Sequence, residues 1–376
     1  MKRHAGALLR VLVSVSILAY LFNGIFHKQA LDYFQAHKID PDTLDWFARA
    51  RIVWSVGPDA LWREFQMINA VWLIAAIISA GIPAILGITR WRWILRVQGL
   101  EVKYSRLFSI SFIGLFFNAF MLGSTGGDVV KAWYVAHETH HKKAEAIATV
   151  VVDRLIGLLV LFVIALTMMA IYHQRVLRDP KLFWFSMATL GVIVFTVVGT
   201  LVGLWRGFVD KIPGARSWLQ RMPKYEALRR MVEAYRIYAS HPMVLVRTML
   251  ISVPVHFFSM LSVWCVGMGL AVGSASFLDY FLYLPIINSV TSVPITISGF
   301  GVREAMYVKM FHEVGVAGSV ALVMSLLGYL AALFWSIVGG GFFLTHRKEL
   351  PPTEQMVSDE AEQGPPITTE RSMSRW

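Results

Sequence analysis

Six apolar stretches divide this chain of 376 residues, and each is long enough to cross a bilayer as a helix, which takes about 20 residues. Only 16% of the residues are charged, whereas soluble domains average about a quarter. We therefore expect an all-α polytopic membrane protein, with one membrane domain over residues 1–346. The six stretches are 7–26, 67–89, 147–171, 182–205, 243–272 and 316–345.

Lysine and arginine gather in four connecting segments, which the positive-inside rule places in the cytoplasm. These are the N-terminus, residues 90–106, residues 206–247 and the "HRKE" after the last stretch. Residues 28–66 are balanced by acids and are expected outside. The first stretch has no small-x-small cleavage site after it, so we expect it to be retained. Both termini then lie in the cytoplasm, and the polar residues 347–376 form a disordered cytoplasmic tail.

Two further apolar stretches do not fit a simple crossing. Residues 107–122 begin and end on the cytoplasmic side, and their helix of about 24 Å is shorter than the hydrocarbon core of about 30 Å. Residues 277–304 must likewise leave and return on the outer side. We expect two re-entrant helical hairpins, entered from opposite sides. The first ends in "GSTGG", and the second is interrupted by Pro285, Pro294, Gly299 and Gly301.

The two halves of the chain then repeat the same order of span, loop, span, hairpin and span in opposite orientation. Repeat one covers about 7–171 and repeat two about 182–345, and in both the second span starts about 60 residues after the first. Inverted repeats with broken helices are typical of secondary transporters. The glycines free backbone N–H groups near helix ends, which are good places to hold an anion.

Charged residues outside the predicted loops are the candidate site residues, because a charge within the bilayer costs about 2.5–3.5 kcal/mol on insertion scales. They are Asp153 and Arg154 inside the third stretch, with Asp128, Lys131, Arg303 and Glu304 at the hairpins. Asp128 could also cap the helix that follows it or pair with Lys131. Asp153 and Arg154 point about 100° apart on a helix, so each needs its own partner from this set.

These motifs resemble a known family. Asn118, followed by Gly-x-x-Gly-Gly-Asp and a base three residues on, is similar to the membrane region of lysylphosphatidylglycerol synthases and to the free-standing flippase-like domain proteins. Asp153-Arg154 and the "SGFGVRE" after Pro294 carry the same resemblance, which covers residues 10–347. It implies a protein that moves lipids or lipid-linked groups between leaflets. The synthase domain of the larger relatives is missing, so no aminoacyl transfer is expected.

We therefore expect a lipid flippase of the cell membrane that works by alternating access, and neither an enzyme nor a protein with a cofactor. Its three site bases would bind an anionic head group, and its three site acids would pair with those bases in the empty site. The expected substrate-binding residues are Asn118, Gly126, Gly127, Asp128, Lys131, Asp153, Arg154, Asn288, Ser298, Gly299, Gly301, Arg303 and Glu304. The expected partners are membrane lipids and lipid-synthesising enzymes at the inner leaflet. The net charge of +11 reflects the cytoplasmic loops, so no nucleic-acid binding is expected.

Two other functions stay open at this point: a transporter of a soluble anion, and a membrane-embedded transferase that acts on a lipid. No nucleophile–base constellation and no nucleotide motif favours the enzyme. The string "HETHH" at 137–141 matches a zinc pattern, but it lies in a predicted cytoplasmic loop beside two lysines and has no obvious third ligand. The basic amphipathic residues 215–240 are expected to lie on the inner leaflet. Cys265 is the only cysteine, which excludes an intramolecular disulfide.

Overall fold

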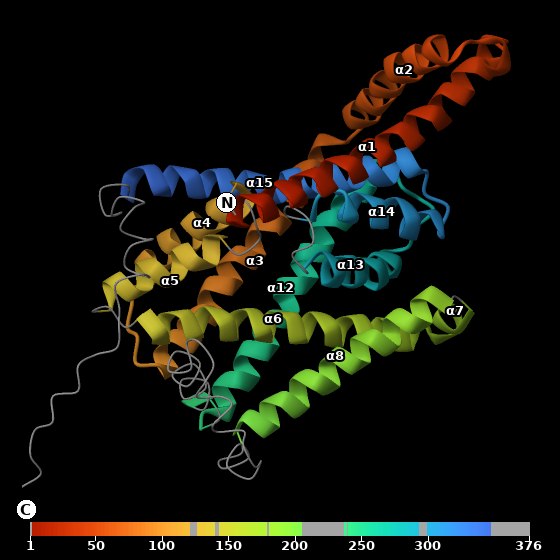
Figure 1. Ribbon diagram of the computed structural model, residues 1–376. Helices are drawn as coiled ribbons and strands as arrows, with labels where there is room; N and C mark the ends of the chain where they lie inside the picture. Colours follow the sequence, from red (N-terminus) through yellow and green to blue (C-terminus); the bar gives the residue numbers. More distant parts are fainter. Residues whose placement is uncertain are drawn as a thin grey trace, which may run out of the picture.

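In the computed structural model, every regular element of the described residues is a helix. The structure describes residues 2–120, 126–139, 143–178, 180–204, 237–238, 240–292 and 299–346. Figure 1 shows the helices, which in chain order are α1 (Lys2–Ala36), α2 (Trp46–Gln66), α3 (Ala70–Val97), α4 (Tyr104–Phe120), α5 (Gly126–Glu138), α6 (Lys143–Ile171), α7 (His173–Arg178), α8 (Pro180–Leu204), α12 (Pro242–Gly269), α13 (Phe277–Thr291), α14 (Val302–His312) and α15 (Gly318–His346). A short 3₁₀ turn, η1 (Pro41–Thr43), joins α1 to α2.

Four of these helices, α3, α6, α12 and α15, are long and apolar enough to cross a membrane. They account for the predicted spans 67–89, 147–171, 243–272 and 316–345. The remaining two predicted spans fall within α1 and α8, and the structure describes only part of the side chains of either helix. An all-α membrane protein is therefore confirmed, whereas the number of spans and the inverted repeat stay predictions.

One boundary was predicted wrongly. Residues 90–106 were expected to be a cytoplasmic loop, but α3 continues to Val97. Arg90 is only 8% exposed, and Trp91 and Leu95 on the same stretch are buried with it. The boundary was placed too early because counting lysines and arginines over residues 90–106 treats every base of the segment as a loop residue. On a helix, Arg90 can face the interior while Arg96, less than two turns later, stays in solvent.

Both predicted hairpins are present as pairs of packed helices, α4 with α5 and α13 with α14. In the first pair, Arg106 near the start of α4 donates to Glu138 at the end of α5 at 2.6 Å. In the second pair, Gly315 after α14 lies beside Ser274 before α13. Each pair therefore brings its two ends together. The breaks at 121–125 and 293–298 lie outside the described residues, and the membrane depth of the hairpins stays a prediction.

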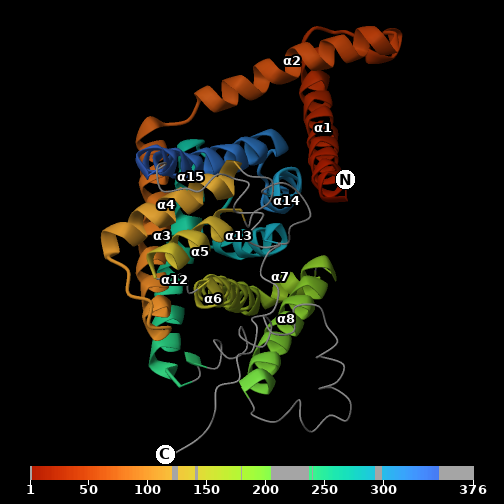
Figure 2. The ribbon, with the colours of Figure 1, turned by 60° about the vertical axis from the view of Figure 1, so that its left-hand side comes forward.

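Small residues set the close packing of α4. A Cβ on Gly127 would lie 1.9 Å from the carbonyl oxygen of Gly114, and one on Gly339 of α15 would lie 2.0 Å from that of Phe112. Helix α4 is thus held at backbone distance between α5 and α15. Figures 1 and 2 show α15 and α4 on one side of the body, α6 and α8 on the other, and the end of α2 projecting away from it. The predicted basic loop lies mostly outside the described residues, and the predicted tail lies wholly outside them.

Candidate functional site

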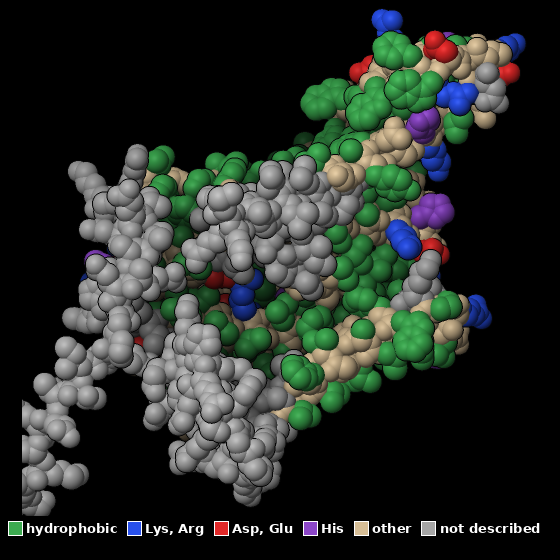
Figure 3. All heavy atoms as spheres, in the orientation of Figure 1, with side chains coloured by type: hydrophobic (Ala, Val, Ile, Leu, Met, Phe, Trp, Pro, Cys, Tyr) green, Lys and Arg blue, Asp and Glu red, His purple; other side chains and the backbone are tan. Residues whose placement is uncertain are grey.

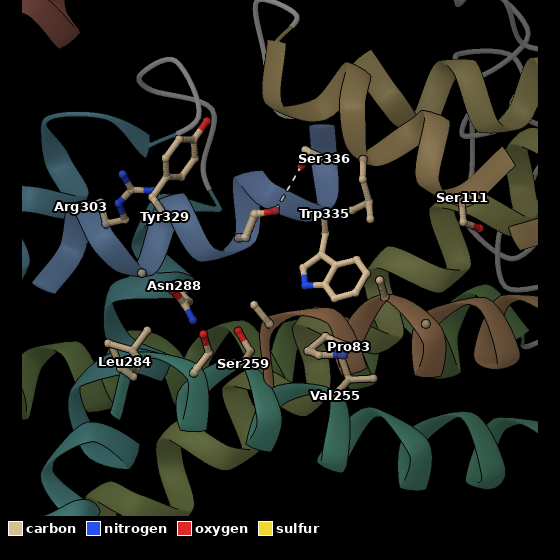
Figure 4. A pocket seen from close by; sticks show the side chains of 18 of the residues that line it. Pro83, Ser111, Val255, Ser259, Leu284, Asn288, Arg303, Tyr329, Trp335 and Ser336 are labelled. Atoms are coloured by element: carbon tan, nitrogen blue, oxygen red, sulfur yellow. Dashed lines mark hydrogen bonds between the residues drawn. The ribbon is translucent and has the colours of Figure 1, made fainter. Parts of the chain in front are cut away.

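A cavity of about 440 Å³ lies between helices of both halves of the chain. Helices α3, α4, α5 and α6 line it from the first half, and α12, α13, α14 and α15 from the second. Figure 4 shows some of these side chains, and Figure 3 shows basic and acidic side chains in a hollow with hydrophobic side chains beside them. The charged lining residues are Arg90, Lys131, Asp153 and Arg303, and the polar or aromatic ones include Ser111, Ser259, Ser262, Asn288, Tyr307, Ser325, Tyr329, Trp335 and Ser336.

Asp153 has a partner that the sequence did not suggest. Arg90 donates from Nε to Oδ1 at 2.7 Å and from Nη2 to Oδ2 at 2.9 Å, a two-pronged pairing that fixes the orientation of both groups. The third nitrogen, Nη1, donates to Ser252 of α12 at 2.9 Å. Arg90 therefore ties α3, α6 and α12 together beside the cavity. The sequence did contain a signal for a buried Arg90, because the apolar pattern of α3 continues past this residue.

The neighbouring residue, Arg154, forms an ion pair with Asp128 of α5. Adjacent positions on α6 thus reach two different helices, as their separation of about 100° requires. Asp128 therefore does not depend on the pair with Lys131 that the spacing also allowed. Neither Asp128 nor Arg154 is among the lining residues of the cavity, so this second pair holds α6 to α5.

Arg303 and Glu304 begin helix α14 at the other side of the cavity. Glu304 is fully buried, and its Oε2 accepts the N–H of Gly301 at 2.6 Å, which caps the helix. Its Oε1 accepts Arg303 Nη2 at 2.6 Å. The guanidinium of Arg303 also lies over the rings of Phe300, at 4.9 Å, and Tyr329, at 4.6 Å. Arg303 is thus held in place where it lines the cavity.

Lys131 completes the charged lining. Its aliphatic stem crosses Gly114 of α4, where a Cβ would lie 2.8 Å from the Lys131 Cγ, and its Nζ lies 5.2 Å from the centre of the Trp91 ring. In the part of the chain that the structure describes, Lys131 forms no ion pair. The lining therefore has three bases against one acid, and one positive charge stays uncompensated even when the buried Glu304 is counted.

The glycines of the two motifs have structural tasks. The N–H of Gly127 donates to Asn118 Oδ1 at 2.8 Å, and that of Gly301 to Glu304, so neither is free for an anion. Gly301, with φ of 88°, and Gly299, with φ of 77°, occupy the left-handed region that only glycine adopts without strain. Gly127 and Gly301 therefore serve helix packing and capping in this structure, and their expected role in holding the head group stays a prediction.

The other expected site residues divide as follows. Of the thirteen, the cavity gathers four, and the remaining nine lie outside its lining or beyond the described residues. The four are Lys131, Asp153, Asn288 and Arg303. Gly126 opens α5, and Ser298 lies outside the described residues. In the zinc-like string, Glu138 pairs with Arg106, and the described residues contain no cluster of three metal-ligating side chains.

The fold and this cavity define a multi-pass membrane protein with an internal cationic site. The chain belongs to the family described as the lysylphosphatidylglycerol synthase TM region, whose model matches residues 46–340. It is 24% identical to a UPF0104 membrane protein of Pyrococcus horikoshii, over 80% of this chain and 94% of that protein. A UPF0104 membrane protein of Methanocaldococcus jannaschii is 23% identical, over 74% of this chain and 85% of its own. No solved structure matches the chain.

Proposed function

We propose that this protein moves an anionic lipid, or a lipid-linked anionic group, between the leaflets of the cell membrane. The observation that carries the proposal is Lys131, an uncompensated base in a cavity built from both halves of the chain. Lys131 is half-buried and forms no ion pair with another described residue. A charge that is partly removed from water is disfavoured without a partner, so a ligand that supplies the opposite charge would be favoured there. A phosphate or phosphodiester group supplies that charge.

The three bases that line the cavity would have different roles in binding the anion. Lys131 would meet the anion as a point charge, while Arg303 adds directional donors from a guanidinium that the two rings already orient. Arg90 stays with Asp153 and sets the shape of the wall. Alternating access would expose the cavity to each leaflet in turn, and both termini would lie in the cytoplasm. The protein would act as a transporter and not as an enzyme, and it would receive its lipid from enzymes at the inner leaflet.

Lys131→Met tests the proposal, because it removes the charge and keeps the length of the side chain. Purified protein is reconstituted into vesicles with acyl-labelled phosphatidylglycerol, and a membrane-impermeant reductant measures how fast the label changes leaflet. We expect the variant to lose transport by about tenfold or more, since the anion loses its one unshared counter-charge in a low-dielectric site.

Two controls make the result specific. Lys103→Met removes an exposed lysine before α4 and should transport normally. The melting temperature of Lys131→Met should not fall below that of the wild type, because no ion pair with a described residue is broken and an unpartnered charge is removed. A normal transport rate in Lys131→Met would contradict the proposed function.

A further inference from the structure

Ser111, Ser259 and Asn288 are neutral polar lining residues of the cavity whose side chains have no hydrogen-bond partner within the described residues. The hydroxyl of Ser111, on α4, is buried and has no hydrogen bond, although the residue is only 4% exposed. Ser259 on α12 and Asn288 on α13 also form no side-chain hydrogen bond with another described residue. Figure 4 shows Asn288 close to Ser259 and Ser111 at the opposite side of the space. These groups surround the same volume as the bases.

Other hydroxyls of the same cavity are already satisfied. Ser262 of α12 donates to the carbonyl of Ala76 on α3 at 2.8 Å, and Ser325 donates to Glu304 at 3.3 Å. Buried polar groups in folded proteins are nearly always hydrogen-bonded, and those that are not call for an explanation. Ser111 is such a buried group, whereas Ser259 and Asn288 are half-buried and line the same cavity. A ligand that offers hydroxyl groups would satisfy the three open side chains at once.

The aromatic residues of the lining fit the same kind of ligand. The indole N–H of Trp335 donates to the carbonyl of Ile77 at 2.7 Å, so the ring is locked and only its apolar surface is left for a ligand. Ligand pockets of this size class combine such apolar walls with a few polar groups that fix orientation. An amine on the ligand would be disfavoured, because the lining already has an excess of positive charge.

We propose that the cavity selects a polyhydroxylated head group, a polyol or sugar joined to a phosphodiester, over an equally charged head group without hydroxyls. This inference rests on the proposed function and names its substrate class. The phosphodiester would meet Lys131 and Arg303, and the hydroxyls would bond to Ser111, Ser259 and Asn288. A site built to bond a hydroxyl strongly rejects the analogue that lacks it, because its polar groups are then left unpaired.

Two lipids of equal charge test the selection. Phosphatidylglycerol and phosphatidylpropanol carry the same phosphodiester and a three-carbon head group, but only the first has free hydroxyls. Each is acyl-labelled and measured in the reductant assay with wild-type protein. We expect phosphatidylglycerol to move about tenfold faster or more.

Variants then assign the preference to the open side chains. Asn288→Leu and Ser111→Ala should each reduce the ratio of the two rates toward one. Ser262→Ala makes the same chemical change as Ser111→Ala, but at a hydroxyl that is already bonded, so its ratio should stay at the wild-type value.

The outcomes separate the two proposals. Equal rates for both lipids in the wild type, with Lys131→Met slow on both, would overturn the polyol selection and leave anionic lipid transport standing. Movement of neither lipid by the wild type would overturn both. An equal drop of the ratio in Ser111→Ala and Ser262→Ala would also overturn the assignment, because it would show a general effect of serine loss in the cavity.

Discussion

Asp153→Asn is expected to destabilise the protein far more than the loss of one carboxylate charge usually does. The side chains of Arg90 and Asp153 are only 10% and 15% exposed, and the substitution leaves the arginine without its counter-charge. Removing one partner of a buried ion pair costs about 3–5 kcal/mol. Because Arg90 borders the cavity, where water can reach it, we take the lower end, about 3 kcal/mol. At roughly 2–4 °C per kcal/mol, the melting temperature should fall by about 6–12 °C.

The chain contains a matched control for this measurement. Arg106 and Glu138 also pair at 2.6 Å, but their side chains are 22% and 31% exposed. Glu138→Gln should therefore cost at most about 1 kcal/mol. Both variants are heated in the same detergent and followed by tryptophan fluorescence. The double variant Arg90→Gln/Asp153→Asn should recover part of the loss, since no unpaired charge is left in it. Equal melting temperatures for Asp153→Asn and Glu138→Gln would refute the reasoning.

Three further predictions concern the hairpins and helix α2. Gly127→Ala should lower the yield of folded protein, because its Cβ would lie 1.9 Å from a carbonyl oxygen of α4, whereas Gly87→Ala has open space and should fold normally. Burial raises the pKa of Glu64 in the folded protein above its usual value. The folded protein therefore loses stability as the pH rises from the usual pKa through the raised one, because the buried carboxyl must then ionise. Glu64→Gln should therefore raise the melting temperature at neutral pH and leave it unchanged near pH 4, about the usual pKa of a carboxyl group. Single cysteines at the exposed Glu101 and Glu313, in a cysteine-free background, should react with an impermeant thiol reagent from opposite sides of the membrane, and labelling from one side would contradict the inverted repeat.

Much of the fold could be predicted because membrane helices are recognised in a sequence by their length and apolar composition. The runs at 67–89, 147–171, 243–272 and 316–345 all lie in helices that can cross a membrane. The glycine-rich breaks separated the paired helices of both hairpins. A charge in the bilayer is costly, so charged residues outside the loops were predicted to form the site. Three of them, Lys131, Asp153 and Arg303, line the cavity.

The pairing of these charges could not be predicted, since it depends on which helix faces each side chain. Asp153 was expected to choose a partner from the hairpins, but α3 brings Arg90 against it. Arg90 was overlooked because a base at the end of an apolar run reads as a loop residue. The open serines were hidden for a different reason. A serine in a helix can bond to its own backbone, to a neighbouring helix or to neither, and the sequence does not distinguish these cases. Only the packed structure shows that Ser262 bonds to α3 while Ser111 has no partner within the described residues.

The three bases of the cavity differ in how firmly the protein holds them, and this order suggests how a head group is taken up. Arg90 is bound through all three nitrogens, and Arg303 is bound by Glu304 and two rings. Lys131 forms no ion pair with another described residue, and its ammonium lies near the ring of Trp91. An anion that enters can therefore bind Lys131 without breaking any ion pair, and it then lies where the fixed donors of Arg303 can orient it. A compact ammonium on a flexible stem suits capture, and a planar guanidinium packed against two rings suits alignment. Exchanging the two, as Lys131→Arg with Arg303→Lys, would keep the net charge and remove this division of tasks.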